Sequence, residues 1–247
     1  QKIIVKDLHP MSQGHGEQLK KLVLQRNQIY HPILYKIIGA FDKNVGEWCA
    51  HNHVVSIVME VDENKLLRGQ MLRETDLFKL VRSVAEVQMQ LKSTIGLFAE
   101  IHPDLFRVTA NGCPKLLDIG LLGQEPTAYL KMLRSNLYKA CLSPLELQGL
   151  AIRTAAPFGD MEKNSIFSLG IVLLSHGSNI DHSAFYDYPN FKVRYSQIIY
   201  YINRLHTQGF SRMFVGFVGN MLNENEVTRP TYSSILEFIM NNARLQD

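Results

Sequence analysis

The sequence predicts a mixed α+β fold, in which a small sheet precedes a larger helical part. Three runs rich in β-branched and apolar residues, a composition typical of strands, lie at 2–8, 33–41 and 53–61. After residue 62 the apolar residues recur at helical spacing instead. Strands followed by helices in this order favour an α+β chain over alternating β-α units.

The first part of the chain also contains one predicted helix. Residues 16–29 place Leu19, Leu22 and Val23 at helical spacing. His31-Pro32 follows this segment, and the residue before a proline is disfavoured in the helical conformation. We therefore expect the helix to end shortly before this dipeptide.

Four further helices are predicted in the second part. The longest, 75–93, carries an apolar stripe, whereas 164–177 is apolar nearly all round and should be buried. The stripe consists of Leu77, Leu80, Val81, Val84, Val87 and Leu91. Two more helices are expected at 193–208 and 230–243. The aromatic-rich stretch 191–214 is interpreted first as core helix, with an interaction surface as the alternative.

Composition narrows the classes of function. The net charge of the 247 residues is only +3 and no Lys/Arg cluster is longer than a pair, which disfavours nucleic-acid binding. No apolar run is long enough for a membrane span. Cys49, Cys113 and Cys141 are too scattered for a disulfide framework, which favours an intracellular, cytoplasmic or cytoskeletal protein. The chain opens directly in a predicted strand, as expected of a piece of a longer protein.

Seven short segments resemble, in order, the sequence motifs of the protein kinase family. They are IIVK (3–6), YHPILYKIIGAF (30–41), IVMEV (57–61), KLLDIGLL (115–122), CLSPLEL (141–147), SIFSLGIVLL (165–174) and TRPTYSSIL (228–236). They match the third strand, the turn after helix C with the following strand, the hinge, Asp-Phe-Gly, Ala-Pro-Glu, the start of helix F and the late Arg-Pro motif. The resemblance implies a two-lobed kinase-like fold. Its β-rich N-lobe would occupy 1–61, begin at the third strand and be incomplete at its start, and its larger helical C-lobe would occupy 62–247.

The resemblance also locates the positions that carry out phosphoryl transfer. Asp118 matches the metal-binding aspartate, and counting back eighteen residues places Glu100 where the catalytic aspartate belongs. The magnesium-binding asparagine falls on Leu105, whose apolar side chain cannot ligate a hard cation. The extra methylene of Glu100 displaces its carboxylate by roughly 1 Å, and misplacement on this scale can cost about a hundredfold in rate. The degenerate positions are Leu22, Phe98, Ala99, Glu100, His102 and Leu105.

The nucleotide pocket implied by the resemblance is also altered. Ile4 replaces a small alanine that packs on adenine, and Arg107 stands where an apolar residue lies beneath it. That guanidinium must be solvated, paired, or itself in the pocket, because an unpaired buried charge is costly. The chain contains no glycine-rich loop, and we expect no cofactor. If a nucleotide does bind, the positions implied are Ile4, Lys6, Met59, Glu60, Val61, Arg107 and Asp118.

Several other positions depart from the family pattern. Leu22 stands where helix C carries the glutamate partner of Lys6, and Glu17 is too close in sequence to Lys6 to replace it, although this register stays open. Ser165 replaces the aspartate of helix F. Glu146 lies one residue late but is expected to reach Arg229.

The remaining candidates carry alternatives. WCAHNH (48–53) offers Cys49, His51 and His53 but no fourth ligand, so no metal site is predicted. Trp48 either packs on its own lobe or anchors a partner. The stretch 119–142 holds Thr127, Tyr129, Ser135 and Tyr138, but Ala99 replaces the arginine that would receive an activating phosphate.

These observations predict a kinase-like domain without phosphoryl-transfer activity. It would act as a protein-interaction scaffold or allosteric module whose partners are other protein subunits, with no nucleic acid and no membrane. A divergent active kinase using Lys6, Glu100 and Asp118 is one alternative, and an ATP-binding switch without turnover is another. The retained Lys6 and Asp118 would otherwise pair with each other or face solvent.

Overall fold

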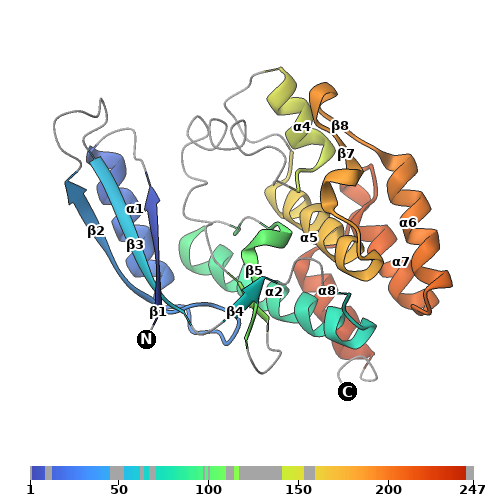
Figure 1. The fold of residues 1–247 in the computed structure, drawn as a ribbon, viewed down its shortest axis with the longest axis horizontal. Coiled ribbons are helices and arrows are strands. Elements are labelled where there is room, and N and C mark those ends of the chain that lie inside the picture. The colour runs from blue at the N-terminus through green and yellow to red at the C-terminus, as the bar shows by residue number, and fades with distance from the viewer. Residues whose placement is uncertain are drawn as a thin grey trace.

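The computed structural model describes residues 2–8, 13–44, 53–61, 64–66, 71–96, 98–99, 101–109, 114–116, 141–152 and 159–242. Within these ranges the protein is a mixed α+β structure with three small antiparallel sheets and seven α-helices (Figure 1). The predicted α+β class is confirmed. None of the helices in these ranges combines the length and apolarity needed to cross a bilayer.

The first sheet is formed by β1 (Lys2–Leu8), β2 (Ile37–Asn44) and β3 (His53–Val61), in the order β1-β3-β2. Helix α1 (Gln13–Arg26) connects β1 to β2 and packs on β2 and β3. Its Leu19, Leu22 and Val23 are buried, as their helical spacing predicts. In Figure 1 this sheet and α1 lie apart from α5 and the helices that follow it.

The second strand begins later than the sequence predicts. The apolar run 33–41 suggests one strand, but β2 starts at Ile37. Ile33 and Leu34 instead contact the second sheet, where Leu34 forms a bridge with Leu116 and the Ile33 carbonyl accepts a hydrogen bond from the Leu116 N–H at 2.7 Å. Apolar content alone cannot separate these two roles, because both bury the side chains.

The second sheet joins the two parts of the molecule. It consists of β4 (Asn64–Leu66), β5 (Phe106–Thr109) and β6 (Pro114–Leu116), in the order β4-β5-β6. β3 ends at Val61, so the predicted boundary after residue 61 falls in the connection to this sheet. Whether the two parts are separate domains stays a prediction.

The helical part is built on α2 (Glu74–Ile95) and α5 (Met161–Ser178). Helix α2 ends at Gly96, whose left-handed conformation (φ 77°) lets its N–H bond to the Lys92 carbonyl. Around α5 lie α4 (Pro144–Ala151), α6 (Tyr195–Thr207), α7 (Arg212–Met221) and α8 (Tyr232–Asn241). Shorter elements are η1 (Pro103–Leu105), η4 (His182–Phe185), β7 (Tyr186–Asp187), η5 (Tyr188–Asn190), β8 (Lys192–Val193) and η6 (Glu226–Thr228).

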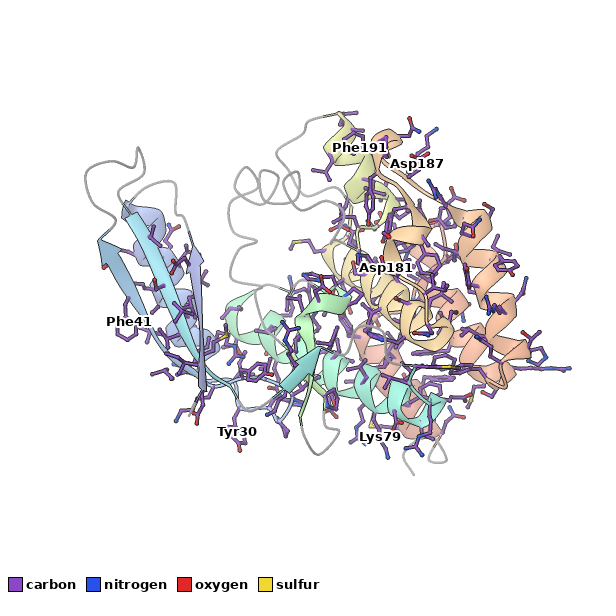
Figure 2. All side chains as sticks on the ribbon, viewed as in Figure 1. Tyr30, Phe41, Lys79, Asp181, Asp187 and Phe191 are labelled. Carbon is purple, nitrogen blue, oxygen red and sulfur yellow. The ribbon has the colours of Figure 1, made fainter. Side chains whose placement is uncertain are left out.

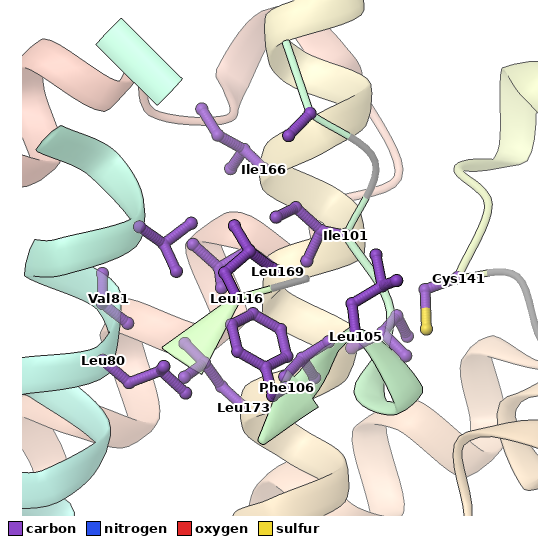
Figure 3. Close-up of a cluster of buried hydrophobic side chains, with 14 of the residues drawn as sticks. Leu80, Val81, Ile101, Leu105, Phe106, Leu116, Cys141, Ile166, Leu169 and Leu173 are labelled. Atoms are coloured by element: carbon purple, nitrogen blue, oxygen red, sulfur yellow. The ribbon is translucent and has the colours of Figure 1, made fainter. Parts of the chain in front are cut away.

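The core between α2 and α5 contains the residues that follow α2. Figure 3 shows the Phe106 ring between side chains of the two helices, which include Leu80 and Leu173. Leu105 and Leu116 belong to the same cluster, and both are buried. The second sheet is thereby attached to the helical part through its apolar side chains.

Candidate functional site

The candidate site is the segment that resembles a catalytic loop, from Phe98 to Arg107. A single side chain of α2, Gln88, binds its first part. The Gln88 Oε1 accepts a hydrogen bond from the Ala99 N–H at 2.7 Å, and the Gln88 Nε2 donates to the Ala99 carbonyl at 2.9 Å. Gln88 is fully buried. One glutamine therefore satisfies both backbone groups of Ala99, which would otherwise be buried unpaired.

Two further side chains extend this contact to α5 and α8. The Gln88 Nε2 also donates to the Ser165 Oγ at 3.2 Å, and Ser165 shares a 2.6 Å hydrogen bond with the Tyr232 hydroxyl. The Phe98 ring lies 5.7 Å from the Tyr232 ring. We call Gln88, Ala99, Ser165 and Tyr232 the loop network. It connects three helices to the segment, since each helix supplies one member.

The loop network is suited to positioning and not to proton transfer. Its side chains are an amide, an aliphatic hydroxyl and a phenol, and none of these titrates near neutral pH. Burial raises the pKa of Tyr232 well above its usual value, so its proton is held more firmly still. The network therefore fixes the backbone at Ala99 and supplies no general acid or base.

The other degenerate positions described in this segment point into the core. Ala99, His102 and Leu105 are all buried, and the Leu105 N–H donates to the His102 carbonyl at 3.0 Å. Leu105 packs with Phe106 (Figure 3). Glu100 lies outside the described residues. An apolar side chain in a packed cluster offers no oxygen to a magnesium ion.

Arg107 is paired with backbone carbonyls. Its Nη1 donates to the Asp104 carbonyl at 2.8 Å and lies 3.4 Å from the Phe106 carbonyl. The residue is half-buried on β5, opposite Lys115. The sequence left three possibilities for this guanidinium: solvated, paired, or in the pocket. The structure shows it paired, and its partners are backbone carbonyls within three residues of Arg107.

The implied nucleotide positions lie on β1 and β3. Ile4 is opposite Met59 and Lys6 is opposite Ile57 in the antiparallel ladder. Met59 is buried, and Glu60 is half-buried, with its N–H bonded to the Lys36 carbonyl at 3.0 Å. Val61 ends β3, opposite Lys2. The side chains of Ile4, Lys6 and Val61, and the whole of Asp118, lie outside what the structure describes, so the contact between Lys6 and Asp118 stays a prediction.

Helix α1 carries core residues where the resemblance would place the glutamate partner of Lys6. Leu22 is buried against the sheet, and the large Arg26 at the end of the helix is only 2% exposed. Glu17 contacts Lys20 at 2.6 Å, and Lys20 also contacts Asp42 at 2.7 Å. The Glu17 carboxylate is thus bound by a lysine one turn away on the same helix.

The predicted contact between Glu146 and Arg229 is wrong in its detail. The Glu146 carboxylate accepts the Ser143 N–H at 2.7 Å in a capping box at the start of α4. The buried Arg229 donates to the carbonyls of Asn223 at 2.8 Å, Glu224 at 3.2 Å and Lys163 at 3.3 Å. Among the described residues no direct ion pair joins the two side chains. The Glu146 carboxylate and the Arg229 guanidinium each bind backbone groups that lie near them in space. These contacts take the place of the predicted contact between the two side chains.

Charge nevertheless acts between these two residues. Burial raises the pKa of Glu146, and the bond from Ser143 together with the charge of Arg229 opposes this. Burial likewise lowers the pKa of Arg229, against the raising effect of nearby groups that include Glu146. The Arg229 guanidinium also lies 4.8 Å from the Phe167 ring of α5. Contacts that connect α5 to the segment before α8 include those of Arg229 with the Lys163 carbonyl and with this ring.

Sequence reasoning missed Gln88, although the sequence contains a signal for it. Gln88 lies four residues after Val84 and three before Leu91, so it interrupts an otherwise apolar stripe. A polar residue at a core position indicates that buried backbone groups need partners. Tyr232 was also missed, because an aromatic residue in a helix is usually read as core.

A second unpredicted contact joins the two parts of the molecule. The Glu86 carboxylate on α2 lies 3.0 Å from both the His31 Nε2 and the Arg82 Nε. His31 belongs to the turn that precedes β2, so this contact ties the turn to the longest helix. It was missed because the two residues are far apart in the sequence.

The remaining candidates fall largely outside the described residues. They are Trp48, Cys49, His51, Cys113, Thr127, Tyr129, Ser135 and Tyr138, together with the side chain of His53. Cys141 is described and buried. Across the described ranges no group of three or more His, Cys, Asp or Glu side chains is placed to hold a metal ion. No protein-family model matches the chain, and no curated protein matches it.

Proposed function

We propose that this chain is a protein kinase-like domain without phosphoryl-transfer activity, which acts as a protein-interaction scaffold or allosteric module in a larger assembly. The observation that carries the proposal is the burial of Leu105 in the core beside the loop network. The segment that resembles a catalytic loop is held by contacts that serve packing, and the described residues in it offer no metal ligand at that position.

The topology supports the kinase-like part of the proposal. The order β1-β3-β2, with α1 between the first two strands of the chain, fits the later strands and helix C of a kinase small lobe. The buried α5, surrounded by other helices, fits the central helix of a kinase large lobe. A domain of this kind would bind other protein subunits inside the cell, with no expected role for nucleic acid or membrane.

One observation favours the alternative of an ATP-binding switch. Because the Arg107 guanidinium is bound by carbonyls next to it, it does not need to fill the implied adenine site to find partners. One obstacle to nucleotide binding is therefore weaker than the sequence suggests. A divergent active kinase would use Lys6, Glu100 and Asp118. An ATP-binding switch would need only Lys6 and Asp118.

The test combines ligand binding with turnover. The melting temperature of the purified chain would be measured with ATP, with and without magnesium, since a ligand bound only by the folded state raises apparent stability. Transfer of labelled phosphate to the chain itself and to a general substrate would be measured in parallel. Asp118→Asn is the matched variant.

Three results separate the candidates. No shift and no transfer supports the scaffold. A shift without transfer moves the ATP-binding switch to first place. Transfer that requires magnesium and is lost in Asp118→Asn would overturn the proposal in favour of an active kinase.

A further inference from the structure

Helices α6 and α7 lie in a stretch of the chain without acidic residues. Residues 188–223 contain no Asp and no Glu, although Asp and Glu number 23 in the whole chain. The same stretch contains Lys192, Arg194, Arg204 and Arg212. A small net charge of the chain therefore conceals a local excess of positive charge.

All four cations are exposed, and none forms an ion pair within the described part of the chain. Some exposed or half-exposed cations elsewhere in the described ranges do, since Lys20 contacts Asp42, Arg73 contacts Asp76, and Arg82 contacts Glu86, whereas others such as Lys21 do not. What distinguishes these four is that they follow one another in a stretch of sequence without any carboxylate of its own.

The carboxylates of the neighbouring elements are used in other contacts. Glu74 of α2 accepts hydrogen bonds from Ser211, from its N–H at 2.7 Å and from its Oγ at 2.6 Å. Asp187 accepts one from the Asn190 side chain at 2.9 Å. Neither carboxylate is within ion-pair distance of the four cations, although Asp187 lies opposite Lys192 in the β7–β8 pair and offsets part of its charge.

Two large apolar side chains are exposed among these cations. Ile199 is 58% exposed and Tyr200 is 57% exposed, both on α6. Tyr200 lies one turn before Arg204, which places the two on one stripe of the helix. In Figures 1 and 2, α6 runs along the outer edge of the molecule, with side chains projecting away from α5 and α7. Exposed aromatic and arginine side chains together are typical of the centres of protein interfaces.

We propose that this face of α6 docks an acidic segment of another protein that carries apolar side chains. The α6 surface is defined by Lys192, Arg194, Ile199, Tyr200, Arg204 and Arg212. Charge complementarity selects the acidic segment, and Ile199 with Tyr200 supplies the apolar contact. The proposal rests on the proposed interaction role and names the chemistry of the partner for it.

The burial pattern of α6 favours a protein segment over a lipid surface. A helix that lies on a membrane needs a continuous apolar face to insert. The apolar face of α6, represented by Ile198 and Leu205, is buried in the protein. Ile199 and Tyr200 are the large apolar side chains of α6 that stay exposed. Two such side chains can contact the side chains of a peptide, but they do not form a face that inserts among acyl chains.

The length of α6 sets the size of the probe. Its 13 residues span about 20 Å, which an extended peptide covers with about six residues. We would titrate the chain into a fluorescein-labelled peptide of about ten residues in which Glu alternates with Leu, and follow the anisotropy. A second peptide with Lys in place of Glu controls for apolar binding.

Two double variants distinguish binding at the α6 surface from a general effect of net charge. In Arg194→Glu/Arg204→Glu we expect the affinity for the acidic peptide to fall at least about tenfold, since two favourable charge contacts become repulsive. Lys21→Glu/Lys36→Glu makes the same change in net charge at exposed residues of α1 and of the segment before β2, and should leave the affinity within about twofold. Figure 1 shows α1 and the first sheet apart from α6. Tyr200→Ala should weaken binding without changing its salt dependence.

Each remaining result bears on the proposal directly. Equal loss in both double variants, or equal binding of the Lys peptide, would overturn it. Sedimentation with phosphatidylserine vesicles in the absence of peptide binding would replace it with a membrane role. Its failure is distinguishable from failure of the proposed function, because phosphate transfer reports on the latter alone. Circular dichroism of each variant excludes unfolding as the cause of a loss.

Discussion

His31 donates a hydrogen bond from its Nε2 to the Glu86 carboxylate at 3.0 Å, while its Nδ1 accepts one from the Ile33 N–H at 3.2 Å. Because the carboxylate only accepts and the amide only donates, both ring nitrogens are assigned. The imidazole thus carries its proton on Nε2 and ties the turn before β2 to α2. This joint positions the first sheet relative to the longest helix.

Removal of this joint should destabilise the protein. We expect His31→Ala to lower the free energy of unfolding by about 1 to 2 kcal/mol, since it leaves the Ile33 N–H and one Glu86 oxygen without their partner. Arg73→Ala removes an exposed pair with Asp76 and should change the free energy by less than about 0.5 kcal/mol. Urea unfolding followed by circular dichroism measures both. Equal effects of the two variants would contradict a role for His31 as a joint.

The contact between Glu86 and His31 should contribute less to stability at acidic pH. Burial raises the pKa of Glu86, but hydrogen bonds from His31 and Arg82 outweigh this, so the pKa lies below its usual value of 4.5. A carboxyl with a depressed pKa contributes stability above its unfolded pKa and loses it as the pH falls through the folded one. We therefore expect Glu86→Gln to destabilise the protein at pH 7 and to have a smaller effect below about pH 4. Urea midpoints at the two pH values test this, and a pH-independent effect would contradict it.

Gln88 should be the most sensitive polar residue of α2. Gln88→Leu leaves the Ala99 N–H and carbonyl buried without partners, and we expect a loss of about 3 kcal/mol in the free energy of unfolding. Gln90→Leu, at an exposed position of the same helix, is the matched control and should change it by less than about 0.5 kcal/mol. Thermal and urea unfolding report both values. A mild effect of Gln88→Leu would show that the loop network does not hold the segment.

Glu146 should tolerate loss of its charge better than loss of its side chain. Glu146→Gln keeps an oxygen for the Ser143 N–H, whereas Glu146→Ala removes the capping contact at a loss of about 1 kcal/mol. Since burial raises the pKa of Glu146, the contribution of this residue to stability is greatest below its unfolded pKa and falls as the pH rises through the folded one.

The two Glu146 variants are therefore compared at acidic and alkaline pH. We expect Glu146→Gln to gain stability relative to the native protein on going from pH 5 to pH 8. Urea unfolding at each pH is the measurement. A relative loss on the same change would mean that the charge of Glu146 is needed for its interaction with Arg229.

Two helical glycines should respond in opposite directions to the same substitution. A Cβ at Gly170 of α5 would lie 2.9 Å from Leu222 and 3.1 Å from Met221, so Gly170→Ala should cost about 1 to 3 kcal/mol through overpacking. A Cβ at Gly216 of α7 would meet nothing within 4 Å. Gly216→Ala should therefore stabilise the protein by about 0.5 to 1 kcal/mol. Melting temperatures of the two variants decide this, and a shift in the same direction for both would contradict the packing at α5.

The sequence alone was sufficient where local pattern and burial agree. β1 and β3 occupy the ranges 2–8 and 53–61 that their β-branched composition predicts. α2 extends only slightly beyond the predicted 75–93, because a long apolar stripe is a strong periodic signal. α7 was not predicted as a separate helix, since Gly216 and Gly219 within it weaken its helical propensity.

The candidate site depended on partners distant in the sequence. The resemblance places Leu105 at the position of a metal ligand, and this register stays a prediction, while the structure shows the Leu105 side chain buried. The sequence left three options for Arg107 and predicted a contact of Glu146 with Arg229 that is not made. In both cases the outcome was decided by which backbone carbonyls or amides lie within reach once the chain has folded.

Residue types and their spacing thus determined the α+β class and most of the helices and strands, since local conformation and burial of one face follow from short-range pattern. Tertiary structure decided that Gln88 holds Ala99, that His31 meets Glu86 and that the cations around α6 remain exposed without carboxylate partners. The physical reason is that a hydrogen bond or an ion pair requires atoms within about 3 to 4 Å, and only the packing of distant segments brings such atoms together.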